Sequence, residues 1–315
     1  MLLGMEKKRS ILDSADPTNM EYVRQTYNDA RGLYLGLLSG TNTFDDMPRA
    51  RTFFREAIAA YQAHGMAFEE ARAQHGLAVV AGLLGLEKEC CAAARRCVEL
   101  LAPWLRSADA EKAEWAVKAL RVLSDAESAT LERVRACRRG LDLVKRLGTT
   151  EKWTHYRALF HRAAGIAEAR RRPKTARSLR RSLAHLLEAF AALESLPIDR
   201  QRLVSKGKTA RELARVYRSL AGLRVKADRA GARELLAEAE RSVRLGMELD
   251  REAGLDSPWS HYHLAKILRD RGDRAAASEQ RLIAVRSHER EREPSDPDDH
   301  RIGDAADARA IASEK

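Results

Sequence analysis

Aromatic, proline and cysteine residues are scarce in this 315-residue chain. Aromatic residues make up 5% of it, and there are 8 prolines and 4 cysteines. A β-sandwich or β-barrel needs many β-branched and aromatic strand residues and frequent Gly/Pro turns, so an all-β fold is excluded. Ala, Leu, Arg and Glu are abundant instead, and these residues favour helix. With 44% hydrophobic residues the chain can bury a core, and the composition predicts an all-α protein.

The chain also has no run of about 18 apolar residues, so no membrane-spanning helix is predicted. In Met1–Ile11 apolar residues precede the basic ones, which is the reverse of a secretory signal peptide. The cysteines Cys90, Cys91, Cys97 and Cys137 have neither CxxC spacing nor the density of a disulfide framework. Reduced thiols are the simplest interpretation, and we expect a cytoplasmic protein.

The net charge of +11 is unevenly distributed along the sequence. Residues 1–132 carry 16 Lys and Arg against 19 Asp and Glu, a net charge of −3. Residues 133–233 carry 27 against 8, a net charge of +19, and residues 234–315 carry 14 against 19, a net charge of −5. The positive excess therefore lies in the middle third. Such an uneven charge distribution indicates more about the binding partners of the protein than about its fold.

Apolar residues recur at spacings of three and four almost throughout, which is typical of amphipathic helices. Eleven breaks divide the pattern into about twelve helices. The breaks fall at Thr41–Pro48, Gly65, Gly85–Glu87, Ser107–Ala110, Ser124–Glu127, Gly148–Thr150, Arg171–Pro173, Leu196–Asp199, Arg224–Arg229, Gly254–Pro258 and Gly272–Asp273. We expect a lead segment over 1–19, a helical domain over 20–290 and a flexible, charged tail over 291–315, whose composition cannot bury a core.

The predicted helices form pairs in which small residues recur. Stretches beginning at Tyr61, Leu143 and Leu245 each end one helix at a glycine and start the next with a Leu-Ala or Ala-Ala pair. Small residues at these places allow antiparallel helices to approach closely. We therefore expect Ala265 and Ala277 to be buried where two helices cross.

These residues resemble the tetratricopeptide repeat family, in the longer-period form common in bacterial regulatory proteins. The resemblance extends over about residues 20–290 and is strongest in residues 260–289, although His261 and Arg281 stand where the family usually has aromatic residues. It implies a right-handed superhelix, an α-solenoid of about six antiparallel helical hairpins, whose first helices line a concave surface. The matching residues are Leu264, Ala265, Leu268, Gly272, Asp273, Ala277 and Ala284.

No motif predicts catalysis, a cofactor or a metal. The segment Ser205–Thr209 (SKGKT) resembles the end of a phosphate-binding loop, but the required glycine and preceding strand are missing, so we interpret it as a helix start with Ser205 as a possible cap. His261 and His263 are two residues apart and cannot share a metal from one helix face. Cys90 stands at a packing position and is expected to be buried and unreactive. We therefore expect a protein that is not an enzyme.

The most informative pattern is a basic stripe in the middle third. Lys208, Arg211, Arg215 and Arg218 lie at spacings of three, four and three, so a helix places them on one face, opposite Leu213, Ala214 and Tyr217. Nothing in the packing of that helix requires these charges, so we expect them to be exposed for a partner. The resemblance places further residues in the groove: Arg157, His161 and Arg162 one unit earlier, and Trp259, Tyr262, His263, Lys266 and Arg269 one unit later. A purely solvated Arg-rich surface is the alternative, but the acidic flanking thirds argue against it.

Two kinds of partner suit such a surface. An acidic protein segment could be held by bidentate Arg–carboxylate contacts, and nucleic acid could be held through its phosphates. The only asparagines are Asn19, Asn28 and Asn42, so a peptide clamp built on groove asparagines is doubtful and recognition by charge remains. We predict a non-catalytic interaction, scaffold or regulatory module that binds an acidic segment or partner subunit. The alternative is a nucleic-acid-binding helical-repeat protein that uses residues 133–233, and homo- or hetero-oligomers stay open.

Overall fold

A computed structural model describes residues 19–39, 41–105, 109–127 and 130–290 of the chain. Within these ranges the chain forms twelve α-helices and two short 3-10 helices, without a β-strand. This confirms the predicted all-α class and the number of helices. The elements are α2 (Met20–Ser39), η1 (Phe44–Asp46), α3 (Met47–Ala63), α4 (Ala67–Leu83), α5 (Glu87–Leu101), η2 (Ala102–Trp104), α6 (Ala110–Ala126), α7 (Thr130–Leu147), α8 (Glu151–Arg170), α9 (Ala176–Glu194), α10 (Arg200–Arg224), α11 (Arg229–Glu252), α12 (Pro258–Arg271) and α13 (Arg274–Arg290).

The helices begin and end at local signals in the sequence. At the end of α12, Gly272 has a φ of 93°, its own N–H donates to the Arg269 carbonyl oxygen, and the N–H of Asp273 donates to the Leu268 carbonyl oxygen. At the start of α10, the Asp199 carboxylate accepts a hydrogen bond from the Arg202 N–H at 2.8 Å. The interpretation of Ser205 as a cap was therefore wrong. Asp199 caps this helix, and Ser205 is buried within it.

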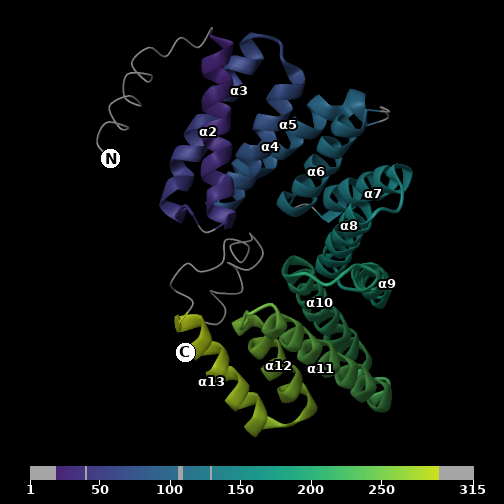
Figure 1. Ribbon diagram of the computed structural model, residues 1–315. Helices are drawn as coiled ribbons and strands as arrows, with labels where there is room; N and C mark the ends of the chain where they lie inside the picture. The colour runs from purple at the N-terminus through teal and green to yellow at the C-terminus, as the bar shows by residue number, and fades with distance from the viewer. Residues whose placement is uncertain (1–18, 40, 106–108, 128–129, 291–315) are drawn as a thin grey trace. The chain divides into compact units, whose positions relative to one another are not determined.

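Successive helices pack as neighbouring pairs (Figure 1). The helical hairpins are formed by α2/α3, α4/α5, α8/α9, α10/α11 and α12/α13. First helices of different hairpins also touch: α2 contacts α4, and α10 contacts both α8 and α12. The described helices divide into two compact units, unit 1 up to Val122 and unit 2 from Leu123, with the division near the end of α6. The consecutive pairing agrees with a helical-repeat architecture, whereas the handedness of a superhelix stays a prediction.

Each unit contains a phenylalanine ring packed on a glycine of a helix adjacent in the sequence. In unit 1, Phe54 of α3 lies against Gly76 of α4, where an added Cβ would come within 2.3 Å of the ring. In unit 2, Phe160 of α8 lies against Gly140 of α7 at the same distance. Both rings are fully buried. The missing side chain is thus what allows these helices to approach, and the rings fill the space.

The small residues at the last hairpin are buried as predicted. Ala277 of α13 lies in a core cluster with Leu264 and Leu268 of α12 and with Val243 of α11, and Ala265 is buried as well. Cys90 is also buried, on α5. The lead segment, except Asn19, and the tail over 291–315 lie outside the described residues. No helix in the described part of the chain is both long and apolar enough for a membrane span.

Candidate functional site: a basic cluster in unit 2

The predicted basic stripe on α10 is not a row of exposed charges. Arg211 is buried, and its guanidinium forms an ion pair with Asp250 of α11, which is 2% exposed. The hydroxyl of Ser260 on α12 lies 3.3 Å from both partners. Arg211 therefore joins three helices inside unit 2, and the expectation that it is exposed for a partner was wrong.

The burial of this pair follows from a close helix approach. A Cβ added at Gly207 of α10 would lie 2.5 Å from the Asp250 carboxylate, and one added at Gly246 of α11 would lie 3.2 Å from the Gly207 carbonyl oxygen. Two glycines facing each other thus allow α10 and α11 to pack backbone against backbone. This contact places Asp250 directly beside Arg211, and it was not visible in the periodicity of either helix.

The other two arginines of the stripe also have carboxylate partners. Arg215 lies 3.0 Å from Glu212 on the same helix, and Arg218 lies 2.6 Å from Asp270 on α12. The idea that nothing in the fold requires these charges was therefore wrong, since Arg211 and Arg218 connect neighbouring helices. Both Arg215 and Arg218 nevertheless remain about one third exposed, so their guanidinium groups still reach solvent.

Cationic side chains from three elements do converge at this face of α10. We define the basic cluster as Lys174 of the α8–α9 loop, Arg215 and Arg218 of α10, and His263 and Lys266 of α12. Partial burial and repulsion from Arg172, Arg215 and Arg218 lower the pKa of Lys174. Burial, and then repulsion from Arg215, Lys266, Arg211 and Arg218, lowers the pKa of His263 well below its usual value. His263 is therefore mainly neutral at pH 7, because burial and the cationic side chains around it disfavour its protonated form.

The α12 aromatics contribute less to this surface than predicted. Tyr262 is buried against Ala284 of α13, so its ring belongs to the core of the last hairpin, and Trp259 packs partly against the same cluster. The Lys266 ammonium lies 3.9 Å from the centre of the Tyr262 ring. The placement of Tyr262 as a groove residue was wrong, because its helix face is covered by α13. Its ring instead holds Lys266 in position.

The residues predicted one unit earlier separate into three environments. Arg162 of α8 is buried and Arg157 is exposed. The His161 Nδ1 lies 3.1 Å from Nδ1 of His185 on α9, and burial, followed by repulsion from His185, lowers the pKa of His161 to about 4. Only Arg157 thus agrees with an open, charged surface. Of the remaining predicted residues, Lys208 is half-buried on α10 and Arg269 is exposed on α12.

Sequence reasoning missed Lys174 and the carboxylate partners of the arginines. Lys174 lies in the basic middle third, residues 133–233, but outside the predicted stripe and groove residues. Asp250 follows Arg211 by 39 residues, and Asp270 follows Arg218 by 52. No short-range pattern connects such pairs, because they depend on how α10 packs against α11 and α12.

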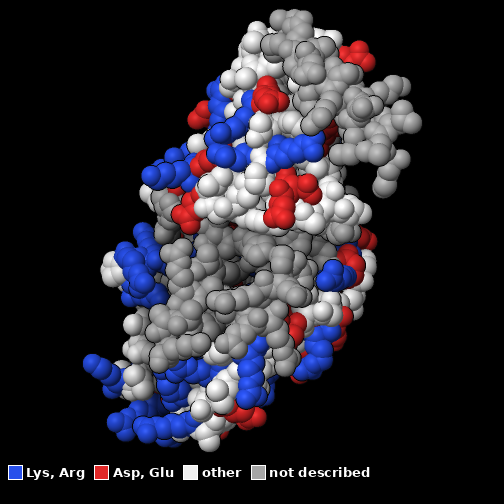
Figure 2. Space-filling model, turned by 90° about the vertical axis from the view of Figure 1, so that its left-hand side faces the viewer, with Lys and Arg blue, Asp and Glu red and all other residues white. Residues whose placement is uncertain are grey.

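The surface charge differs between the two units. On the face drawn in Figure 2, Lys and Arg predominate in the lower part, at the level of α10–α13 in Figure 1, whereas both signs alternate in the upper part.

Within the described ranges, no group of three or more His, Cys, Asp or Glu side chains has an arrangement that could hold a metal ion. No protein-family model matches the chain, and neither does any curated protein.

Proposed function

We propose that the chain is a non-catalytic interaction module, and that its basic cluster binds an acidic segment of a protein partner. The observation that carries the proposal is the convergence of Lys174, Arg215, Arg218 and Lys266 from three elements, with His263 kept neutral among them. Bringing like charges together in a partly buried place has an electrostatic cost, which a bound anion would offset.

The surroundings of the cluster favour carboxylates over a phosphate backbone. Glu212 and Asp270 already lie among the arginines at ion-pair distance, so the surface alternates in sign at close range. A polypeptide with spaced carboxylates can avoid these two acidic groups, whereas an evenly charged phosphate chain would be repelled by them. The consecutive helical hairpins and the resemblance to the tetratricopeptide repeat point in the same direction, since protein ligands are the commoner kind in that family.

Two lysines provide the sharpest test, because neither forms an ion pair with a carboxylate within the described part of the chain. The double variant Lys174→Glu/Lys266→Glu reverses the charge of the cluster and leaves the Arg218–Asp270 pair in place. Its matched control is Lys145→Glu/Lys226→Glu, which makes the same charge change at two exposed positions of unit 2 outside the cluster. The probe is a fluorescein-labelled peptide of ten glutamates, and the readout is fluorescence anisotropy with the full chain.

We expect the cluster variant to weaken peptide binding at least tenfold, which corresponds to about 1.4 kcal/mol, and the control to change it less than threefold. Binding should also weaken between about 50 and 200 mM salt, because exposed charges are screened. Equal losses in both variants would mean that net charge alone attracts the peptide. A labelled 20-nucleotide single-stranded DNA that binds more tightly than the peptide, and loses affinity in the same variant, would establish nucleic acid as the ligand instead.

A further inference from the structure

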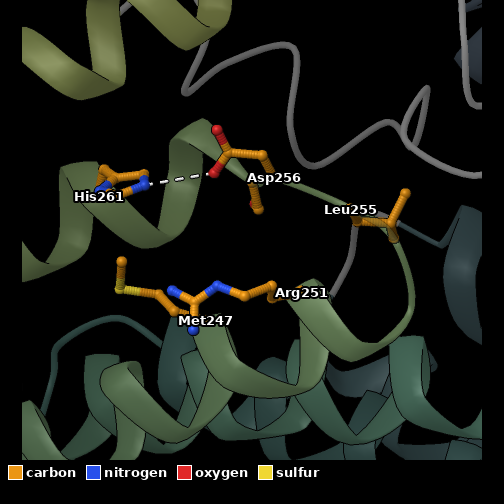
Figure 3. Close-up of a pocket in the computed structure, with 6 residues that line it drawn as sticks. Met247, Arg251, Leu255, Asp256 and His261 are labelled. Carbon is orange, nitrogen blue, oxygen red and sulfur yellow. Dashed lines mark hydrogen bonds and ion pairs between the residues drawn. The ribbon is translucent and has the colours of Figure 1, made fainter.

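A pocket of about 250 Å³ lies where α11 ends and α12 begins, apart from the basic cluster. Met247 and Arg251 line it from α11, Leu255, Asp256 and Ser257 from the connecting loop, and His261 from α12. In Figure 3, Met247 and Arg251 lie on one side of the opening, with Asp256 and His261 on the opposite side. The proposed function uses none of these six residues.

The acidic wall of the pocket is held in position by α13. The two ring nitrogens of His261 lie 2.9 Å from Gln280 Oε1 and 3.3 Å from Asp256 Oδ1. The Ser287 hydroxyl donates to the other carboxylate oxygen of Asp256 at 3.2 Å. The carboxylate of Asp256 is therefore fixed at both oxygens, yet its side chain stays 68% exposed and can accept a further hydrogen bond.

The opposite wall offers a guanidinium. Arg251 is exposed, and no described carboxylate forms an ion pair with it. The pocket thus presents one positive and one negative group across a small space. The side chains of Met247 and Leu255 also line the pocket, and both are half-buried and packed on the core of unit 2. A ligand that complements all three features has a carboxylate, an ammonium group and an apolar body.

We infer that this pocket binds a small zwitterion with an apolar side chain, of the chemical class of the free aliphatic amino acids. The ligand carboxylate pairs with Arg251, where a bidentate contact is available, and the ligand ammonium donates to Asp256. Its side chain covers Met247 and Leu255. A purely anionic ligand is disfavoured because Asp256 would repel it, and a purely cationic one because Arg251 would.

The test uses L-leucine as the probe and isothermal titration calorimetry with the full chain. A ligand of this size in an open pocket is expected to bind with a Kd of about 0.1 to 1 mM. Isoamylamine, which lacks the carboxylate, and 4-methylpentanoate, which lacks the ammonium group, should each bind at least tenfold more weakly. Arg251→Gln and Asp256→Asn should each weaken L-leucine binding at least tenfold, while Arg233→Gln, at an exposed position on α11, should leave it unchanged.

Three results would overturn the inference. The first is no saturable binding of L-leucine up to about 10 mM, ten times the weakest Kd expected. The second is unchanged affinity in Arg251→Gln, whose exposed side chain can be replaced without disturbing the fold. The third is equal binding of 4-methylpentanoate and L-leucine, which would show that the carboxylate alone is recognised. The melting temperature of Asp256→Asn checks that its loss of binding is not a loss of structure.

Discussion

Both units bury a carboxylate between two helices, but they neutralise it differently. In unit 1, Glu70 of α4 is buried, and it pairs at 3.0 Å with Arg96 of α5, whose side chain is 46% exposed. Gln62 of α3 donates a second hydrogen bond to the same carboxylate. In unit 2, Asp250 and its partner Arg211 are both buried.

The difference lies in what can replace a lost partner. Water can reach the half-exposed position of Arg96 and solvate the Glu70 carboxylate if the arginine is removed. No such access exists at Arg211, where the pair is enclosed by α10, α11 and α12. A buried charge left without its partner is strongly destabilising, whereas a solvent-exposed ion pair contributes little. Unit 2 therefore depends far more on its ion pair than unit 1 does.

The largest expected effect follows directly. Asp250→Ala leaves the Arg211 guanidinium buried without a carboxylate and should reduce the free energy of unfolding by about 3 to 5 kcal/mol. Urea denaturation followed by circular dichroism measures this. The control is Asp270→Ala, which removes the partly exposed partner of Arg218 and should cost no more than about 1 kcal/mol. Similar losses in the two variants would contradict the contrast between buried and exposed pairs.

A large residue placed at a helix crossing should reduce stability by a similar amount in the two units. Ala277 in unit 2 and Cys90 in unit 1 are both buried small residues at the start of a second helix. Ala277→Arg and Cys90→Arg each force a long charged side chain into a packed crossing and should cost about 2 to 4 kcal/mol. Thermal melting checks both, with Ser278→Arg as the exposed neighbour on α13 that should change little. A tolerated arginine at only one of the two sites would mean that the crossings are not equivalent.

A pH effect of intermediate size is expected in both units. Burial lowers the pKa of His75 in unit 1 and of His161 in unit 2 to about 4. The unfolded chain, with an ordinary histidine pKa near 6.5, then binds more protons than the folded one between about pH 6.5 and 4, so stability falls as the pH drops through this window. At pH 5 each histidine should lower the free energy of unfolding by about 1 to 2 kcal/mol relative to pH 7.

The pH effect is measured by urea denaturation at pH 7 and pH 5. His75→Gln and His161→Gln should each lose less stability between the two values than the unsubstituted chain, because one titrating group has been removed. A substituted chain with the same pH dependence would show that its histidine does not titrate differently in the folded and unfolded states.

The smallest effect is predicted for the removal of Arg96, the partly exposed ion-pair partner of Glu70 in unit 1. Arg96→Ala should cost only about 1 kcal/mol, since Gln62 still donates to Glu70 and water can take the place of the guanidinium. The measurement is the same urea titration, with Lys88→Ala on the exposed surface of α5 as the control expected near zero. A loss comparable to that of Asp250→Ala would place the two ion pairs in one class after all.

The sequence predicted well what depends on neighbouring residues. Helix ends could be located at breaks such as Gly272–Asp273 and Leu196–Asp199, because their signals act within one turn of the chain, although the cap of α10 is Asp199 and not Ser205 as predicted. The burial of Ala265 and Ala277 followed from the small residues that recur where paired helices meet. Arg211 was misplaced because a helical stripe describes only its own helix, whereas its partner is set by the contact between Gly207 and Gly246. Tyr262 was misplaced for a similar reason, since α13 covers the face that it occupies.

The phenylalanine rings packed on glycines also fix how far one helix can slide along the next. Moving α3 by one turn, about 5.4 Å, would bring Phe54 opposite Arg72 or Val80 of α4, which have side chains where Gly76 has none. Residues inserted between α3 and α4 would therefore be extruded as a longer loop, while the helices keep their alignment. The same holds for α7 and α8 through Gly140 and Phe160. The connections between these helices can thus vary in length during evolution without changing which residues face one another.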